Sequence, residues 1–148
     1  MLYFFDSSVI IAGLITKHPK YSVASPWLEK AIAKKIKWAV APHSLAECYA
    51  VLSTLPVSPR IDAHTARRLI AENIEPTAKI VSLTAREYLD TISEASLHGF
   101  AGGIIYDAVI LKAAHSCKAS QLLTLNGKDF LRLEAALRDG AKKLVVPL

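Results

Sequence analysis

Apolar and polar positions alternate along the chain in blocks that predict strands separated by helices. Short continuous apolar runs predict five strands, at residues 2–5, 38–41, 78–83, 121–125 and 143–146. Longer segments with apolar residues at helical spacing predict seven helices, at residues 7–15, 21–36, 44–55, 62–73, 84–98, 106–118 and 129–138. Because helices separate the strands, we expect an α/β three-layer sandwich with a central parallel sheet of four to five strands.

Local signals place the ends of several of these elements. Pro42 is expected to end the second strand, and Asp62 to cap the helix at 62–73. One apolar stripe is predicted along the helix at 44–55, formed by Leu45, Cys48, Tyr49, Leu52 and Leu55. Three glycines, Gly99, Gly102 and Gly103, predict a flexible break before the helix at 106–118.

Length and composition limit the class of protein. The 148 residues have the usual length of one domain, and 52% of them are apolar, so we expect a single domain over residues 1–148. Cys48 and Cys117 form no C-x-x-C pair, and they suggest neither a disulfide framework nor a thiol–metal site. The first residues carry no basic leader, and no uncharged apolar run reaches membrane-spanning length. The expectation is a soluble cytoplasmic protein with no membrane partner.

The net charge of +5 permits a polyanionic partner such as nucleic acid. Basic residues gather in three stretches, Lys30 with Lys34, Lys35 and Lys37, Arg60 with Arg67 and Arg68, and Arg132 with Arg138, Lys142 and Lys143. Any one such cluster is more typical of a solvated helix face than of a binding site, so charge alone does not identify the partner.

Three acids stand apart from all other charged residues. Asp6 is the only Asp, Glu, Lys or Arg in residues 1–16, Glu47 the only one in residues 38–59, and Asp107 the only one in residues 95–111. Charged side chains are rarely buried unless they are paired, and surface acids normally lie among other charges. The isolation of these acids in strongly apolar segments points to a common function.

The positions of the acids support a shared site. Asp6 ends the first predicted strand, and ligands of parallel α/β sheets bind beyond the carboxyl ends of strands. At about 5 Å and an effective dielectric constant of about 20, each pair of carboxylates repels by about 3 kcal/mol. A bound divalent cation reverses this repulsion, and oxygen ligands without suitably spaced His or Cys favour Mg²⁺, with Mn²⁺ as a substitute. Such ions activate water at phosphoryl groups.

Each acid also has a simpler structural interpretation. Asp6 can cap the following helix, and Asp107 can be an acid in the first turn of its helix. Glu47 lies in mid-helix, where it caps nothing and has no evident local partner. Ser8 and Thr124 are expected to orient the Asp6 carboxylate, although both can simply cap helices or end strands. The five histidines form no metal-binding pattern, and we assign them no catalytic role.

Four segments together resemble the PIN-domain family, and within it the VapC-type toxins of toxin–antitoxin pairs. Residues 6–12, DSSVIIA, are similar to the opening D-x-S element, and residues 44–47, SLAE, to the element with a conserved glutamate. Residues 102–111, GGIIYDAVIL, are similar to the third-acid element, and residues 123–130, LTLNGKDF, to the T-x-[DN]-x-x-x-F block. Where many members carry a fourth acid, this chain has Asn126, with Asp129 three residues later.

The resemblance implies an endoribonuclease with a Mg²⁺-binding acidic cleft. Asp6, Glu47 and Asp107 would be the catalytic metal ligands, with Asn126 or Asp129 as a further ligand; both also fit an N-terminal helix cap of the N-x-x-D kind. The implied partners are an RNA substrate, a cognate antitoxin protein and a second copy of the chain in a homodimer. The RNA target and the cleavage sequence do not follow from it.

Two other classes of function remain open from the sequence. A receiver-like phosphoacceptor domain is also a parallel α/β fold with an acidic Mg²⁺ pocket, but it would want paired acids after the first strand, where this chain has Asp6-Ser7-Ser8. A non-catalytic PIN-fold module that binds RNA or protein is the second alternative. Retention of all three principal acids argues against it.

Overall fold

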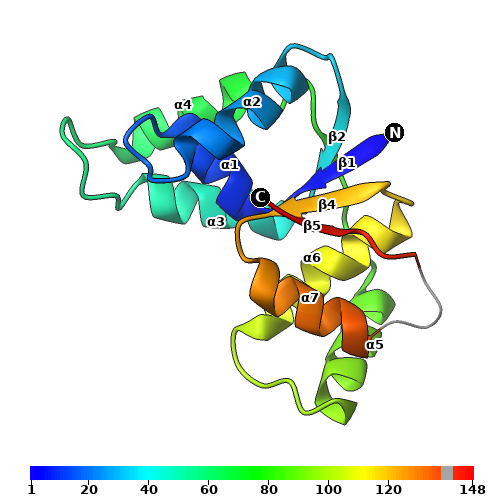
Figure 1. Ribbon diagram of the computed structural model, residues 1–148. Coiled ribbons are helices and arrows are strands. Elements are labelled where there is room, and N and C mark those ends of the chain that lie inside the picture. The colour runs from blue at the N-terminus through cyan, green and yellow to red at the C-terminus, as the bar shows by residue number, and fades with distance from the viewer. Residues whose placement is uncertain (138–141) are drawn as a thin grey trace.

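A five-stranded parallel sheet forms the centre of the protein, in a computed structural model that describes residues 1–137 and 142–148 (Figure 1). The strands are β1 (Leu2–Phe5), β2 (Lys37–Val40), β3 (Lys79–Ile80), β4 (Gln121–Thr124) and β5 (Val145–Pro147). Their order in the sheet is β3-β2-β1-β4-β5, with every neighbouring pair parallel. The predicted parallel sheet is therefore confirmed, and β1 lies at its centre.

Seven helices of the described residues connect the strands: α1 (Ser7–Leu14), α2 (Tyr21–Ile32), α3 (Pro42–Leu52), α4 (Ala63–Asn73), α5 (Ala85–Leu97), α6 (Ile104–Ser116) and α7 (Gly127–Ala136). Figure 1 shows α1 to α4 gathered on one side of the sheet and α5 to α7 on the other. Close packing of α1 on α2 depends on Gly13, where a Cβ atom would lie 2.9 Å from Leu28 Cδ2.

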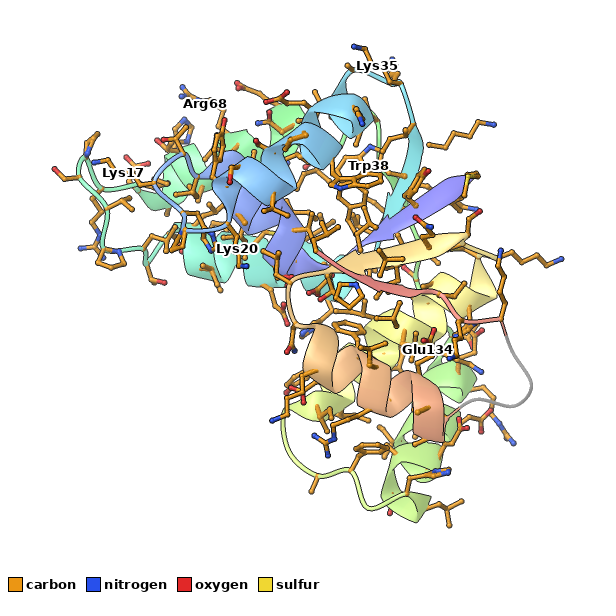
Figure 2. All side chains as sticks on the ribbon, viewed as in Figure 1. Lys17, Lys20, Lys35, Trp38, Arg68 and Glu134 are labelled. Atoms are coloured by element: carbon orange, nitrogen blue, oxygen red, sulfur yellow. The ribbon has the colours of Figure 1, made fainter. Side chains whose placement is uncertain are left out.

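The sheet has an apolar core on each face, because successive side chains of a strand point to opposite sides. Phe5 and Val40 pack with α1 to α4, and Trp38 lies in the same layer (Figure 2). Phe4 and Ala39, their neighbours in sequence, pack instead with α6 and α7. The predicted α/β three-layer sandwich follows from this division, since both layers of helices cover one sheet.

Several predicted boundaries differ from the structure. The helix predicted at 21–36 ends at Ile32, because Lys34 adopts a left-handed conformation with φ of 57°. The helix predicted at 44–55 covers Pro42–Leu52, with proline at its first position, where a missing N–H costs nothing. Of the predicted apolar stripe, Cys48 and Leu52 are buried, whereas Tyr49 is 40% exposed. Asp62 caps α4 as predicted, by accepting from Thr65 N.

Other differences lie near the ends of the later elements. The strand predicted at 78–83 is only Lys79–Ile80, and the last strand is shifted to Val145–Pro147. The helices predicted to begin at 106 and 129 begin two residues earlier, at Ile104 and Gly127. Arg138, the predicted last residue of the final helix, lies outside the described residues.

The strand order makes the carboxyl ends of β1 and β4 the switch point of the sheet. The chain leaves β1 toward helices on one face and leaves β4 toward a helix on the other, so the two loops diverge there.

None of the helices within residues 1–137 and 142–148 is long and apolar enough to cross a membrane.

Candidate active site

Asp6 lies at the carboxyl end of β1, where the chain turns into α1. Its side chain makes no capping hydrogen bond to α1, which contradicts the interpretation of Asp6 as a simple helix cap. The carboxylate instead accepts from two hydroxyl groups at Oδ2, from Ser8 Oγ at 2.6 Å and from Thr124 Oγ1 at 2.9 Å. Asp6 is only 4% exposed, and burial raises its pKa, opposed by these hydrogen bonds.

The two hydroxyl groups also join the ends of β1 and β4. Ser8 Oγ accepts from Leu125 N at 3.0 Å, and Thr124 Oγ1 accepts from Asn126 N at 2.9 Å. Each hydroxyl therefore accepts from the backbone after β4 while it donates to Asp6. This arrangement fixes both the rotamer of the carboxylate and the path of the loop that leads to α7.

Glu47 projects from α3 with both carboxylate oxygens engaged. His43 Nε2 lies 2.7 Å from Glu47 Oε1, one helical turn earlier, while Ser7 Oγ donates to Oε2. Ser7 Oγ is also 3.4 Å from Asp6 Oδ1, so a single hydroxyl lies between two of the acids. The expectation that Glu47 has no local partner is wrong, because the i,i+4 spacing brings His43 onto the same face of the helix.

Asp107 lies in the first turn of α6 and is half-buried. Burial is the main cause that raises its pKa to about 7, and the charges of Asp6, Asp129 and Glu47 raise it further. Asn126 Nδ2 donates to Asp107 Oδ2 at 3.0 Å and partly opposes this rise. Hydrogen bonds to Ser7 and Asn126 thus tie the acids from β1, α3 and α6 to the residues that follow β1 and β4.

Asn126 and Asp129 lie at the start of α7, and Asn126 is in contact with Asp107. Asn126 occupies the N-cap position of α7 without a side-chain capping bond, so its amide is directed to Asp107 instead. Asp129 pairs with Arg132 at 3.2 Å, which partly neutralises it. Asn126 is thus in direct contact with a principal acid, whereas Asp129 acts on Asp107 only through its charge.

The donor set suits a hard divalent cation. Within residues 1–137 and 142–148, no three His, Cys, Asp or Glu side chains are drawn together closely enough to form a ready-made metal site. The charge of Glu47 nevertheless raises the pKa of Asp6, the charges of both raise that of Asp107, and no Lys or Arg of the described residues is among the main influences on Asp6 or Asp107. Carboxylate and amide oxygens are the ligands that Mg²⁺ and Mn²⁺ prefer, so the donor set fits these ions.

A cysteine lies beneath the acids but has no accessible chemistry. Cys48 follows Glu47 on α3 and is fully buried. Burial is the main cause that raises the pKa of its thiol to about 12, with added repulsion from Asp6 and Glu47. A thiol in that state is not a nucleophile at neutral pH.

Three residues of this site were not predicted from the sequence. His43 and Ser7 contact the acids directly, and the ring of Tyr106 stacks on the imidazole of His43 at 4.6 Å. The i,i+4 spacing of His43 and Glu47 was a usable signal, as was the position of Ser7 beside Asp6. The stacking of Tyr106 on His43 had no signal in the sequence, because these residues lie on different helices.

Comparisons with known proteins identify one relative by sequence and several structures with a similar fold. The sequence is 29% identical over 114 residues to ribonuclease VapC27 of Mycobacterium tuberculosis, which covers 77% of each chain. The fold is similar to that of VapC20 of Mycobacterium tuberculosis, described as a sarcin-ricin loop cleaving toxin, with a TM-score of 0.68 and 15% identity over 88% of this chain and 94% of that one. It is also similar to VapBC2 from Rickettsia felis bound to a promoter DNA fragment, with a TM-score of 0.63 and 18% identity over 100% and 99% of the two chains.

The family assignment comes from the sequence itself. Residues 3–136 match the PIN domain family, a span that includes Asp6, Glu47, Asp107 and the start of α7. The match favours the PIN fold over a receiver-like phosphoacceptor domain. The chain therefore belongs to the PIN domain family.

Proposed function

We propose that this protein is a Mg²⁺-dependent endoribonuclease and the toxin of a type II toxin–antitoxin pair. The observation that supports the proposal is that the Ser7 hydroxyl lies against both Asp6 and Glu47, while the charges of these two acids raise the pKa of Asp107. Such a concentration of carboxylates is costly in a protein of this size unless a cation or a substrate makes use of it.

Asp6, Glu47 and Asp107 are the proposed ligands of the metal ion, with Asn126 as a supporting ligand through its amide oxygen and Asp129 as a weaker candidate. A divalent cation bound there supplies Lewis acidity to the phosphoryl group and lowers the pKa of the attacking water. Ser8 and Thr124 hold the Asp6 carboxylate through Oδ2, which leaves Oδ1 on the side of Ser7. The mechanism uses no covalent enzyme intermediate.

RNA is the substrate that the relatives favour. VapC27 is named a ribonuclease, and VapC20 is described as cleaving the sarcin-ricin loop. For this chain we infer cleavage of single-stranded or loop RNA, because the bases of an A-form duplex are inaccessible to side chains in its deep groove. The exposed basic residues of the arm formed by α1 to α4, among them Lys17, Lys20 and Arg68, offer electrostatic attraction to the phosphate backbone (Figure 2).

The proposed partners are a cognate antitoxin and a second copy of the chain in a homodimer, acting in the cytoplasm. Similarity to VapBC2, a toxin–antitoxin complex, supports the antitoxin. Exposed apolar side chains on α5, including Leu89 at 62% and Leu97 at 86%, provide surface for protein contacts. Size measurements of the protein alone and of the product of its native operon test both partners, and a strictly monomeric protein that copurifies with nothing would contradict them.

The decisive experiment compares RNA cleavage in Mg²⁺, in EDTA, and by the Asp107→Asn variant in Mg²⁺. Cleavage is expected only for the unaltered protein with the metal, and the products should carry 5′-phosphate and 3′-hydroxyl ends because water is the nucleophile. Cys117→Ser is the matched control and should retain activity. Cleavage that survives both EDTA and Asp107→Asn, or products with 2′,3′-cyclic phosphates, would show that the proposed mechanism is wrong.

Metal binding can be tested without any RNA. Calorimetry should show that Asp107→Asn weakens Mg²⁺ or Mn²⁺ binding while the variant remains folded. Unchanged metal affinity would remove Asp107 from the site. Metal binding with no cleavage of any RNA would instead favour the non-catalytic binding module.

A further inference from the structure

An exposed aromatic ring stands beside the acids. Tyr106 directly precedes Asp107 on α6, and 52% of its surface is exposed. Its ring stacks on the imidazole of His43, with ring centroids 4.6 Å apart and planes inclined by only 9°. His43 Nε2 lies 2.7 Å from Glu47 Oε1. The stack therefore connects the helix that carries Asp107 with the helix that carries Glu47.

The contacts of His43 hold the tyrosine ring in a fixed orientation. An exposed tyrosine can normally change rotamer freely, but here one face of the Tyr106 ring lies against an imidazole that is itself held by a carboxylate. Burial of an aromatic ring usually stabilises the folded state. Tyr106 is 52% exposed, so much of its ring contributes nothing to the core. The ring is thus ordered yet available to a ligand.

An aromatic face of this kind is suited to a nucleobase. Bases that are unstacked from their neighbours bind to tyrosine rings, and each such contact is worth about 1–3 kcal/mol. Stacking tolerates any base because every base has a π-face, so this contact favours single strands without demanding a sequence. The Tyr106 ring lies against His43, the partner of Glu47, so a nucleotide beside a phosphate held by the acids would come within reach of the ring.

We propose that the stacked pair of Tyr106 and His43 is a platform for one unstacked RNA base next to the phosphate that is cleaved. Tyr106 contacts the base, and His43 is a positioning residue that keeps the ring parallel to it. The inference rests on the proposed ribonuclease function and adds the residues that would select RNA with at least one base free of stacking on its neighbours.

Binding of a fluorescently labelled single-stranded RNA to the Asp107→Asn protein isolates this contact from cleavage. Adding Tyr106→Ala should weaken binding about 5- to 150-fold, which corresponds to one stacked base. Tyr106→Phe should bind like the parent because the ring is retained. Tyr88→Ala is the matched control, since Tyr88 is a similarly exposed tyrosine, at 38%, on α5, and it should have no effect.

A series of RNAs, each with one abasic position, distinguishes stacking from a general structural effect. With Tyr106 present, one abasic position should weaken binding much more than the others. In the Tyr106→Ala protein, an abasic site at that position should weaken binding no more than one elsewhere. The two changes remove the same contact, so their effects on binding are not additive. His43→Ala should weaken binding less than Tyr106→Ala, and His43→Phe should restore it by returning a stacking partner.

Melting curves ensure that each variant is folded, and Tyr106→Leu replaces Tyr106→Ala if the alanine variant is not. Equal RNA affinity with and without the Tyr106 ring, or the same abasic profile in both proteins, would overturn the platform even if the protein cleaves RNA. A parent protein that neither binds nor cleaves single-stranded RNA would overturn the proposed function and the platform together.

Discussion

Two carboxylates of this protein, Asp6 and Glu134, are equally buried, each 4% exposed, yet their surroundings differ completely. Glu134 lies on α7, facing the chain that enters β5 (Figure 2). Its Oε1 accepts hydrogen bonds from Leu144 N and from Val145 N, the latter at 3.0 Å. Asp6 accepts from side-chain hydroxyl groups and shares its surroundings with two more acids.

The difference shows that burial of an acid does not by itself indicate a functional site. Glu134 satisfies two backbone N–H groups and thereby fixes the last strand to α7, which is a structural role. The hydrogen bonds of Asp6 orient it, but the nearby charge of Glu47 opposes its ionisation, and Asp6 in turn raises the pKa of Asp107. An acid whose neighbours disfavour its charge is the better candidate for binding a cation.

The largest predicted difference between Asp6 and Glu134 is in the rate of RNA cleavage when each is replaced by its amide, which removes the charge and keeps the shape. Asp6→Asn should reduce RNA cleavage about a thousandfold, since several kcal/mol of transition-state stabilisation depend on the metal. Glu134→Gln should leave cleavage nearly unchanged, because its amide oxygen can still accept from Leu144 N and Val145 N. Initial rates on one RNA under equal conditions measure both, and equal losses would abolish the distinction.

Glu134 should matter instead for the free energy of unfolding. Glu134→Ala leaves two backbone N–H groups near β5 without their acceptor, which we expect to cost about 2–4 kcal/mol. Denaturant unfolding measures this loss, with the exposed Glu29→Ala as a control that should change little. An unaltered free energy of unfolding in Glu134→Ala would mean that β5 does not depend on this contact.

A smaller effect is expected when the hydroxyl that holds Asp6 is removed. Ser8→Ala deletes one donor to Asp6 Oδ2 and the acceptor of Leu125 N. Loss of a group that orients a metal ligand typically costs about 10- to 100-fold in metal affinity or activity. Metal titration should reveal this loss, whereas Ser116→Ala, which removes a hydroxyl bonded only to its own helix, should retain full affinity.

The smallest predicted effect is a dependence of stability on pH. The pKa of Asp107 is about 7 in the folded protein and about 3.8 when unperturbed, so between these values the folded state holds a proton that the unfolded chain has lost. In EDTA, the protein should therefore lose stability as pH rises from about 4 to about 7, and solvent screening of this half-buried group limits the change to a few degrees in Tm. Asp107→Asn should flatten this slope, and a slope of the opposite sign would contradict the raised pKa.

Charge isolation along the chain distinguishes these two kinds of acid from the sequence alone. Asp6, Glu47 and Asp107 have no charged neighbours in their segments, whereas Glu134 lies two residues from Arg132. The order of strands and helices was also predictable, because hydrophobic periodicity is a local property of the chain. Element ends were less predictable, as at Ile32, where one left-handed residue beyond the helix decides the boundary.

The sequence by itself determined the alternation of elements, the parallel sheet and the three acids, since these depend on spacing, apolar runs and charge along the chain. Only the tertiary structure decided which groups the acids meet. The bond from Thr124 to Asp6 joins residues separated by 118 positions, and the bond from Asn126 to Asp107 joins the starts of two helices. Such contacts depend on the packing of helices against opposite faces of the sheet, which fixes distances that no local pattern encodes.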